Sequence, residues 1–100
     1  MLKKGLFVRL EAKPGKEAEV EAFLKKGLEL ANEEGQTRVW FGVRFGPTTF
    51  AVFDAFDDES GRQAHLNGQI AKALMESAPT LLASPPTIVR YDVSGAKVSG

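Results

Sequence analysis

Few side chains in this chain of 100 residues are suited to proton transfer near neutral pH. The chain contains one histidine, His65, and no cysteine. Because an imidazole titrates close to neutral pH, His65 is the best candidate for a group that transfers protons. In the alternative interpretation, His65 is a polar residue on the flank of a helix and bonds to backbone or water. One histidine without cysteine cannot supply the usual ligands of a tetrahedral zinc site, so we predict no metal site.

A second candidate site surrounds Trp40 and Arg44 in the sequence WFGVR. Residues two apart project from the same face of a strand, and Gly42 between them leaves room for a flat ligand. The Arg44 guanidinium could hold an anionic oxygen there. In the alternative interpretation, Trp40 packs in a core or an interface, and Arg44 pairs with a carboxylate such as Glu11 or Asp92.

Trp40 and Arg44 belong to the segment 36–58, which contains most of the phenylalanines and the only tryptophan. Its β-branched and aromatic residues are typical of strands, and the sequence GPTT within it is typical of a turn. We predict a hairpin with a two-residue loop, Pro47 and Thr48. In this register Phe53 shares a face with Trp40, so we predict that Trp40 and Phe53 bind a substrate.

The same register pairs Phe45 with Phe50 and Val43 with Val52, which leaves both faces of the hairpin largely apolar. A sheet with helices on one side only normally has polar residues on its open side. Something else must therefore cover the second face. We predict that a second copy of the chain does so, which makes the protein a homodimer that assembles through a face of the sheet.

Four further segments surround the hairpin, and their apolar periodicity distinguishes strands from helices. The predicted elements are a strand at 5–12, a helix at 16–34, a helical region from 60 to 77 that is interrupted at Asn67-Gly68 and ended by Pro79, and a strand at 87–93. This order is the ferredoxin-like βαββαβ arrangement of an α+β protein. We predict a single domain of this type over residues 1–93 and a flexible C-terminal tail at 94–100.

The composition argues against several classes of protein. Basic and acidic residues balance at 13 each and no basic stripe is present, which gives no support to nucleic-acid binding. No apolar segment approaches the length of a membrane span, so we predict no association with membranes. The absence of cysteine is consistent with a reducing compartment, and we predict a cytoplasmic protein.

Three short motifs resemble the antibiotic biosynthesis monooxygenase family in their order and spacing. They are AKPGKE, which begins at Ala12, FDAFDD, which begins at Phe53, and AHL, which begins at Ala64. The resemblance extends over about residues 6–93. It implies a ferredoxin-like subunit that assembles as a dimeric α/β barrel, with a pocket between the sheet and the helices.

The resemblance also implies an activity. Some members of the family oxidise phenolic or quinol substrates with molecular oxygen and use no metal or flavin, so we expect a small aromatic, quinol or polyketide-like substrate and no cofactor. His65 matches the histidine of the family's second helix and would be the base. Arg44, which is a candidate from the strand geometry and matches no family motif, would stabilise an oxyanion. The alternative is a non-catalytic homodimer of the same fold that binds a small ligand or acts in a stress response.

Overall fold

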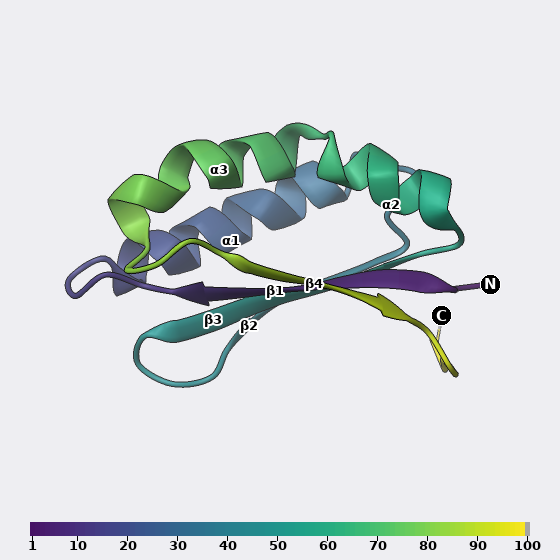
Figure 1. The fold of residues 1–100 in the computed structure, drawn as a ribbon, viewed down its shortest axis with the longest axis horizontal. Helices are drawn as coiled ribbons and strands as arrows, with labels where there is room; N and C mark the ends of the chain where they lie inside the picture. The colour runs from purple at the N-terminus through teal and green to yellow at the C-terminus, as the bar shows by residue number, and fades with distance from the viewer. Residues whose placement is uncertain (100) are drawn as a thin grey trace.

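The computed structural model of the protein describes residues 1–99. Along the chain it contains β1 (Lys4–Glu11), α1 (Glu17–Ala31), β2 (Val39–Arg44), β3 (Thr49–Phe56), α2 (Glu59–Leu66), α3 (Gln69–Leu81) and β4 (Thr87–Asp92). The strands form one antiparallel sheet in the order β2-β3-β1-β4, and the three helices lie on one side of it (Figure 1). This arrangement confirms the predicted α+β, ferredoxin-like fold.

The central strands β1 and β3 provide most of the core. Side chains alternate along a strand, so Leu6 and Leu10 of β1 point toward the helices, and each is only 1% exposed. On β3 the same face carries Phe50, which is fully buried. Burial of a large apolar side chain contributes about 1.5–3 kcal/mol to stability. The helices complete this core with Val20, Leu24 and Ala78.

The hairpin formed by β2 and β3 has a different register from the predicted one. The structure pairs Val43 with Ala51, whereas the predicted partner was Val52. A shift by one residue exchanges the faces of one strand relative to the other. Trp40 therefore faces the helices, while Phe53 lies on the opposite face of the sheet. The prediction that Trp40 and Phe53 share one face of the hairpin is therefore wrong.

The register shift originates in the loop of the hairpin. The N–H of Phe45 donates a hydrogen bond to the carbonyl of Thr49 at 2.7 Å, which leaves three loop residues instead of the predicted two. The Arg44 guanidinium donates to the loop carbonyls of Gly46 at 3.0 Å and Pro47 at 2.8 Å. These bonds satisfy carbonyls that have no partner in a strand, and so they stabilise the wider loop.

Two helix ends also differ from the predicted ones. The helix α1 ends at Ala31 rather than at residue 34, and in the following turn the N–H of Glu34 donates to the Ala31 carbonyl at 3.0 Å. The helix α3 continues through Pro79 to Leu81. Pro79 lies in its last turn, so its missing N–H removes one helical hydrogen bond close to the end of the helix. The N–H of Lys13 donates to the Leu81 carbonyl at 2.8 Å and holds this end.

The face of the sheet that points away from the helices is apolar, and no described residue covers it (Figure 1). Phe41, Phe53 and Val89 on this face are 59%, 42% and 46% exposed. Phe7 and Tyr91 meet the ring of Phe53 edge-on, with centroid distances of 5.1 and 5.8 Å. Continuous exposed apolar patches are uncommon on monomeric proteins. The sheet thus has a second apolar face, as the sequence predicted.

The predicted tail begins after β4. Residues 94–99 lie outside helices and strands, and Gly100 lies outside the described residues. Within residues 1–99, no helix has the length and the apolar character needed to span a lipid bilayer.

Candidate functional site

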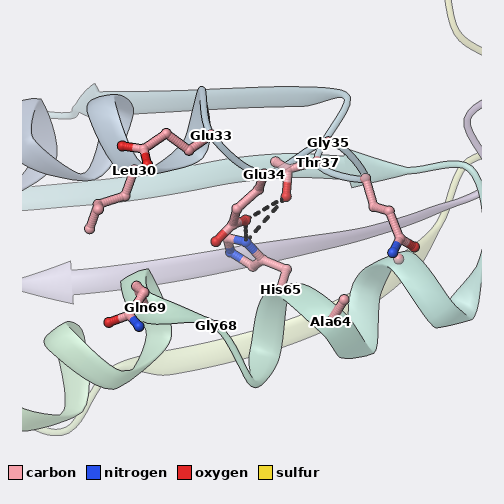
Figure 2. Close-up of a pocket in the computed structure, with 11 residues that line it drawn as sticks. Leu30, Glu33, Glu34, Gly35, Thr37, Ala64, His65, Gly68 and Gln69 are labelled. Carbon is pink, nitrogen blue, oxygen red and sulfur yellow. Dashed lines mark hydrogen bonds and ion pairs between the residues drawn. The ribbon is translucent and has the colours of Figure 1, made fainter.

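His65 lies in the last turn of α2, and carboxylates contact both nitrogens of its ring. The Nδ1 atom is 2.6 Å from Glu34 Oε1, and the Nε2 atom is 3.0 Å from Asp54 Oδ2. Figure 2 shows the side chains of His65, Glu34 and Thr37 pointing toward one another. The sequence offered backbone or water as the alternative partners of His65, and the partners in the structure are carboxylates.

Asp54 brings a carboxylate into the apolar interior. It lies on the helix-facing side of β3 and is 1% exposed. Its Oδ1 atom has no hydrogen-bond partner among residues 1–99, and Oδ2 has the His65 ring as its charge partner. Charged groups are rarely buried in this way unless they are paired. The sequence analysis missed Asp54, although an acidic residue in the apolar alternation of Phe50, Val52 and Phe56 was a usable signal.

Glu34 reaches His65 from the turn after α1. The Thr37 hydroxyl donates to Glu34 Oε1 at 2.7 Å and fixes the carboxylate. Gly68, between α2 and α3, leaves space for it, because a Cβ atom at this position would lie 3.0 Å from Glu34 Oε2. The break that the sequence predicted at Asn67-Gly68 therefore lets Glu34 approach the imidazole. Nothing in the sequence indicated that Glu34 would take part.

The surroundings of His65 act on its pKa in opposite directions. Burial of the ring by itself lowers the pKa, but the carboxylates of Asp54 and Glu34 outweigh burial and hold the pKa of His65 above its ordinary value. The arrangement therefore favours the imidazolium more than the surroundings of an unperturbed histidine do. An imidazolium can stabilise a nearby anion or donate a proton. The Asp54 carboxylate beside it can accept a proton from a bound molecule.

An apolar cavity of about 140 Å³ lies between the sheet and the helices, and His65 and Asp54 form part of its wall. Trp40 lines it as well, and its indole Nε1 is buried without a hydrogen-bond partner among residues 1–99. Gly27 of α1 allows Trp40 to pack closely, since a Cβ there would lie 3.1 Å from Trp40 Cζ2. The remaining wall is almost entirely aliphatic and includes Leu6, Val8, Leu66, Ile70, Leu74, Met75 and Ile88.

His65 also borders a second, more open hollow on the side of Glu34 (Figure 2). This groove has a volume of about 480 Å³, and its lining includes Thr37 and Gln69. The imidazole therefore lies between the apolar cavity and this groove. The residues described by the structure contain no group of three or more acidic or histidine side chains arranged to bind a metal ion.

Arg44 lies in a third hollow, between α1 and β2. Its guanidinium contacts Glu21 at 3.3 Å and lies 4.9 Å from the centre of the Phe50 ring. Arg44 pairs with Phe50 in the sheet, so it lies four residues, or about 13 Å, along the strand from Asp54. The structure therefore does not bring Arg44 and His65 together. Glu11 and Asp92, the partners suggested by the sequence, bond elsewhere.

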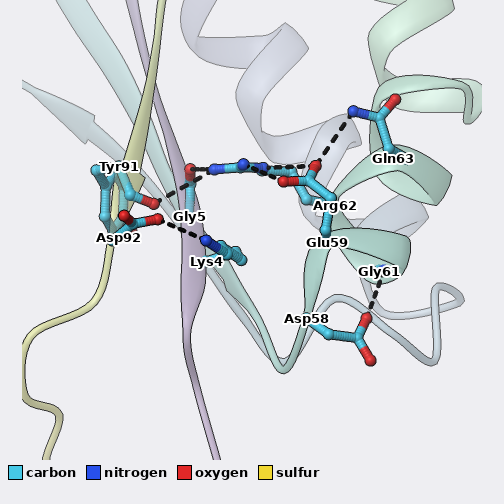
Figure 3. A network of polar contacts seen from close by, with 9 residues as sticks. All are labelled: Lys4, Gly5, Asp58, Glu59, Gly61, Arg62, Gln63, Tyr91 and Asp92. Carbon is cyan, nitrogen blue, oxygen red and sulfur yellow. Dashed lines mark hydrogen bonds and ion pairs between the residues drawn. The ribbon is translucent and has the colours of Figure 1, made fainter.

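A buried arginine that the sequence analysis missed attaches α2 to the sheet. Arg62 is 6% exposed and donates to the carbonyls of Gly5 at 3.2 Å and Tyr91 at 3.3 Å. It also bonds to Glu59 within its own helix (Figure 3). These contacts connect α2 to β1 and β4, and Asp58 caps the helix by accepting from the Gly61 N–H at 2.9 Å. Together they fix the helix that carries His65.

The raised pKa of His65 predicts how stability depends on pH. Below about pH 6.5 the imidazole is protonated in both the folded and the unfolded chain, and its stabilising contribution is fully present. As the pH rises through the higher folded pKa, this contribution is lost. We expect the free energy of unfolding in urea to fall between pH 6.5 and pH 9, and the fall to be absent in His65→Gln. A wild-type stability that rises over this range would contradict the prediction.

Comparisons with known proteins relate this chain to a family. Neither a protein-family model nor a curated protein matches the chain. The crystal structure of NE2512 from Nitrosomonas europaea, a protein of unknown function, matches it with 60% sequence identity and a TM-score of 0.97, over 100% of this chain and 97% of that chain. This chain belongs to the family of NE2512.

More distant structures identify the fold of the NE2512 family. A candidate antibiotic biosynthesis monooxygenase from Nitrosomonas europaea matches with 16% identity and a TM-score of 0.82, over 92% of this chain and 90% of that chain. Another from Deinococcus radiodurans matches with 15% identity and a TM-score of 0.83, over 97% of this chain and 99% of that chain. The fold is therefore like that of the antibiotic biosynthesis monooxygenases, as the sequence motifs indicated.

Proposed function

We propose that the protein is a cofactor-independent monooxygenase that oxidises a small aromatic or quinol substrate with molecular oxygen. The observation that carries this proposal is the pair of His65 and Asp54 in the wall of an apolar cavity. Buried acid–base pairs of this kind are a feature of active sites. The fold adds support, since it is shared with candidate antibiotic biosynthesis monooxygenases.

In the proposed reaction, Asp54 accepts the proton of a substrate hydroxyl, and the imidazolium of His65 stabilises the resulting anion. The sequence had suggested His65 as the base and Arg44 as the oxyanion partner. We propose these changed roles because carboxylates contact both ring nitrogens of His65 and hold its pKa above the ordinary value, and because Arg44 lies in another groove. Trp40 keeps its predicted role as a wall of the substrate cavity.

The substrate anion then supplies electrons directly to oxygen, and the apolar cavity keeps water away from the reacting atoms. For a hydroquinone, one oxygen atom converts a ring C–H into C–OH, and the other leaves as water while the ring becomes a quinone. The substrate loses four electrons in total, two in each conversion, and one molecule of oxygen accepts all four. No external reductant is needed.

We also propose that two copies of the chain assemble through the uncovered face of the sheet. The support is the cluster of aromatic side chains around Phe53, which no described residue covers. A second copy would bury the same cluster on both subunits, as twofold assemblies do. In this arrangement Phe53 would contact the partner subunit, and it lies across the sheet from the cavity that contains Trp40.

One observation favours the alternative function, a homodimeric protein that binds a small ligand without catalysis. Both nitrogens of His65 already have carboxylate partners, which is also what a purely structural ion pair would show. The cavity could then bind a ligand and leave it unchanged. The measurement of oxygen consumption separates the two functions.

Oxygen uptake by the purified, metal-free protein should exceed the autoxidation of at least one substrate in a panel of hydroquinones. Asp54→Asn should lower the enzymatic rate about 100-fold or more, the usual effect of losing a general base. His65→Gln should also lower it. The matched control is Glu76→Gln, which changes an exposed carboxylate on α3 and should retain the wild-type rate.

Two outcomes would count against the monooxygenase. One is the absence of uptake with every hydroquinone, which would favour the ligand-binding function. The other is a rate that Asp54→Asn leaves unchanged.

An Arg44→Gln variant tests the oxyanion-stabilising role that the sequence suggested for Arg44. A loss of oxygen-uptake rate as large as that of Asp54→Asn would bring Arg44 back into the mechanism.

A further inference from the structure

We infer that the cavity beside Asp54 binds a molecule with a single aromatic ring that carries a hydroxyl group, and that this hydroxyl donates a hydrogen bond to Asp54 Oδ1. That this molecule is oxidised rests on the proposed function, but its binding does not.

The size of the cavity limits the ligand to one ring. Its volume is about 140 Å³. Apolar protein cavities of about 150 Å³ accommodate benzene. A fused two-ring or three-ring molecule would require the core to expand, and close-packed cores resist expansion. The larger polyketide-like substrates expected from the sequence therefore fit this cavity poorly.

The polar atoms in the wall indicate a hydroxyl group. Among residues 1–99, the buried side-chain polar atoms without a hydrogen-bond partner are Trp40 Nε1 and the two carboxylate oxygens of Asp54. Both residues line this cavity, and they are direct neighbours on the helix-facing side of β2 and β3. Since His65 Nε2 lies 3.0 Å from Oδ2, Oδ1 is the carboxylate oxygen that has neither a hydrogen-bond partner nor a charge partner among residues 1–99.

An indole N–H can only donate a hydrogen bond, and an ionised carboxylate can only accept one. A hydroxyl group does both, so one hydroxyl can donate to Asp54 and accept from Trp40. A methyl group in the same place would satisfy neither residue. Buried polar atoms that stay unpaired cost free energy, which makes the cavity selective for a ligand that pairs them.

Two lining residues indicate where the ligand enters. Met75 of α3 and Ile88 of β4 are 60% and 45% exposed, while Leu6 on the cavity floor is 1% exposed. The mouth of the cavity therefore lies between α3 and β4. The carboxylate of Asp54 is covered by its neighbours, so the apolar side chains must shift as the hydroxyl reaches Oδ1. Methionine suits this position because its unbranched side chain adapts easily.

Phenol and toluene test this inference, because they have the same shape and differ only in a hydroxyl and a methyl group. Their dissociation constants for the wild-type protein can be measured by NMR titration at pH 7. We expect phenol to bind about tenfold more tightly than toluene, or more, although toluene is the more hydrophobic molecule. We expect 1-naphthol, which has the same hydroxyl on two fused rings, to bind at least tenfold more weakly than phenol.

Variants of Asp54 provide the matched comparison. Asp54→Asn keeps an acceptor oxygen of the same shape and should retain a preference for phenol. Asp54→Val removes the acceptor and should reverse the preference in favour of toluene. If Asp54→Val does not fold, the wild-type ratio and Asp54→Asn still decide the question.

Three results would overturn the inference. They are toluene binding as tightly as phenol to the wild type, 1-naphthol binding as tightly as phenol, and no binding of any of the three probes. The proposed oxidation fails separately. A protein that prefers phenol but consumes no oxygen with any hydroquinone would retain this binding site and lose the monooxygenase function.

Discussion

Replacement of His65 by alanine is expected to lower the free energy of unfolding by about 3–5 kcal/mol, because it leaves the buried carboxylate of Asp54 without its cation. Asp54 is 1% exposed and its nearest charge partner is His65 Nε2 at 3.0 Å. Domains of this size have total stabilities of about 5–15 kcal/mol, so the change removes a large part of the total. Urea denaturation at pH 7 measures it.

Three further variants show whether the buried charge is the cause. Glu34→Gln should cost far less, because the side chain of Glu34 is 22% exposed and Thr37 can still bond to the amide. His65→Gln should lose less than His65→Ala, since an amide N–H can replace the contact to Asp54. The double variant Asp54→Val with His65→Leu should recover most of the loss, because it removes both charges. A loss below about 1 kcal/mol in His65→Ala would show that the pair contributes little.

This expected loss affects how activity is tested. A fall in oxygen uptake in His65→Ala would mix catalysis with unfolding, whereas Asp54→Asn and His65→Gln keep the shape and some of the bonding of the original side chains. The pH profile gives an independent measure, because the stabilising contribution of His65 disappears only as the pH rises above about 6.5.

The sequence identified half of the buried pair for a clear reason. His65 is the only histidine, so its chemistry was visible from composition alone. Asp54 is one of 13 acidic residues, and only its place in the apolar alternation of β3 distinguishes it. Glu34 could not have been predicted, because it lies 31 residues from His65 and reaches the imidazole only after α1 ends at Ala31. That end is three residues earlier than the predicted end at residue 34.

The fold was more predictable than the site, because it depends on many residues at once. The order of elements follows from periodicity in every segment, and an error of a few residues at a helix end leaves it unchanged. The faces of the hairpin depend on one loop. The sequence GPTT is compatible with loops of two or three residues, and the additional bonds from Arg44 favour the longer one. One residue in the loop was enough to separate Phe53 from Trp40.

Phe53→Glu is expected to convert a dimer into a monomer. In the proposed assembly, the uncovered face of the sheet meets the same face of a second copy, and Phe53 lies within its aromatic cluster. A twofold interface contains each substitution twice, so the variant would bury two unpaired carboxylates close together. We expect the dissociation constant of the dimer to rise about 100-fold or more. Light scattering coupled to gel filtration at micromolar concentration measures the change.

Leu28→Glu is the matched control for this prediction. Leu28 is 46% exposed, which is close to the exposure of Phe53, but it lies on α1 and lines the groove beside β2. The same change in charge and polarity there should leave the dimer intact. If both variants dissociate, the uncovered face is not the specific interface, and a wild-type monomer at micromolar concentration would exclude this assembly. A dimer that only Phe53→Glu disrupts would explain why a sheet with helices on one side has apolar residues on both faces.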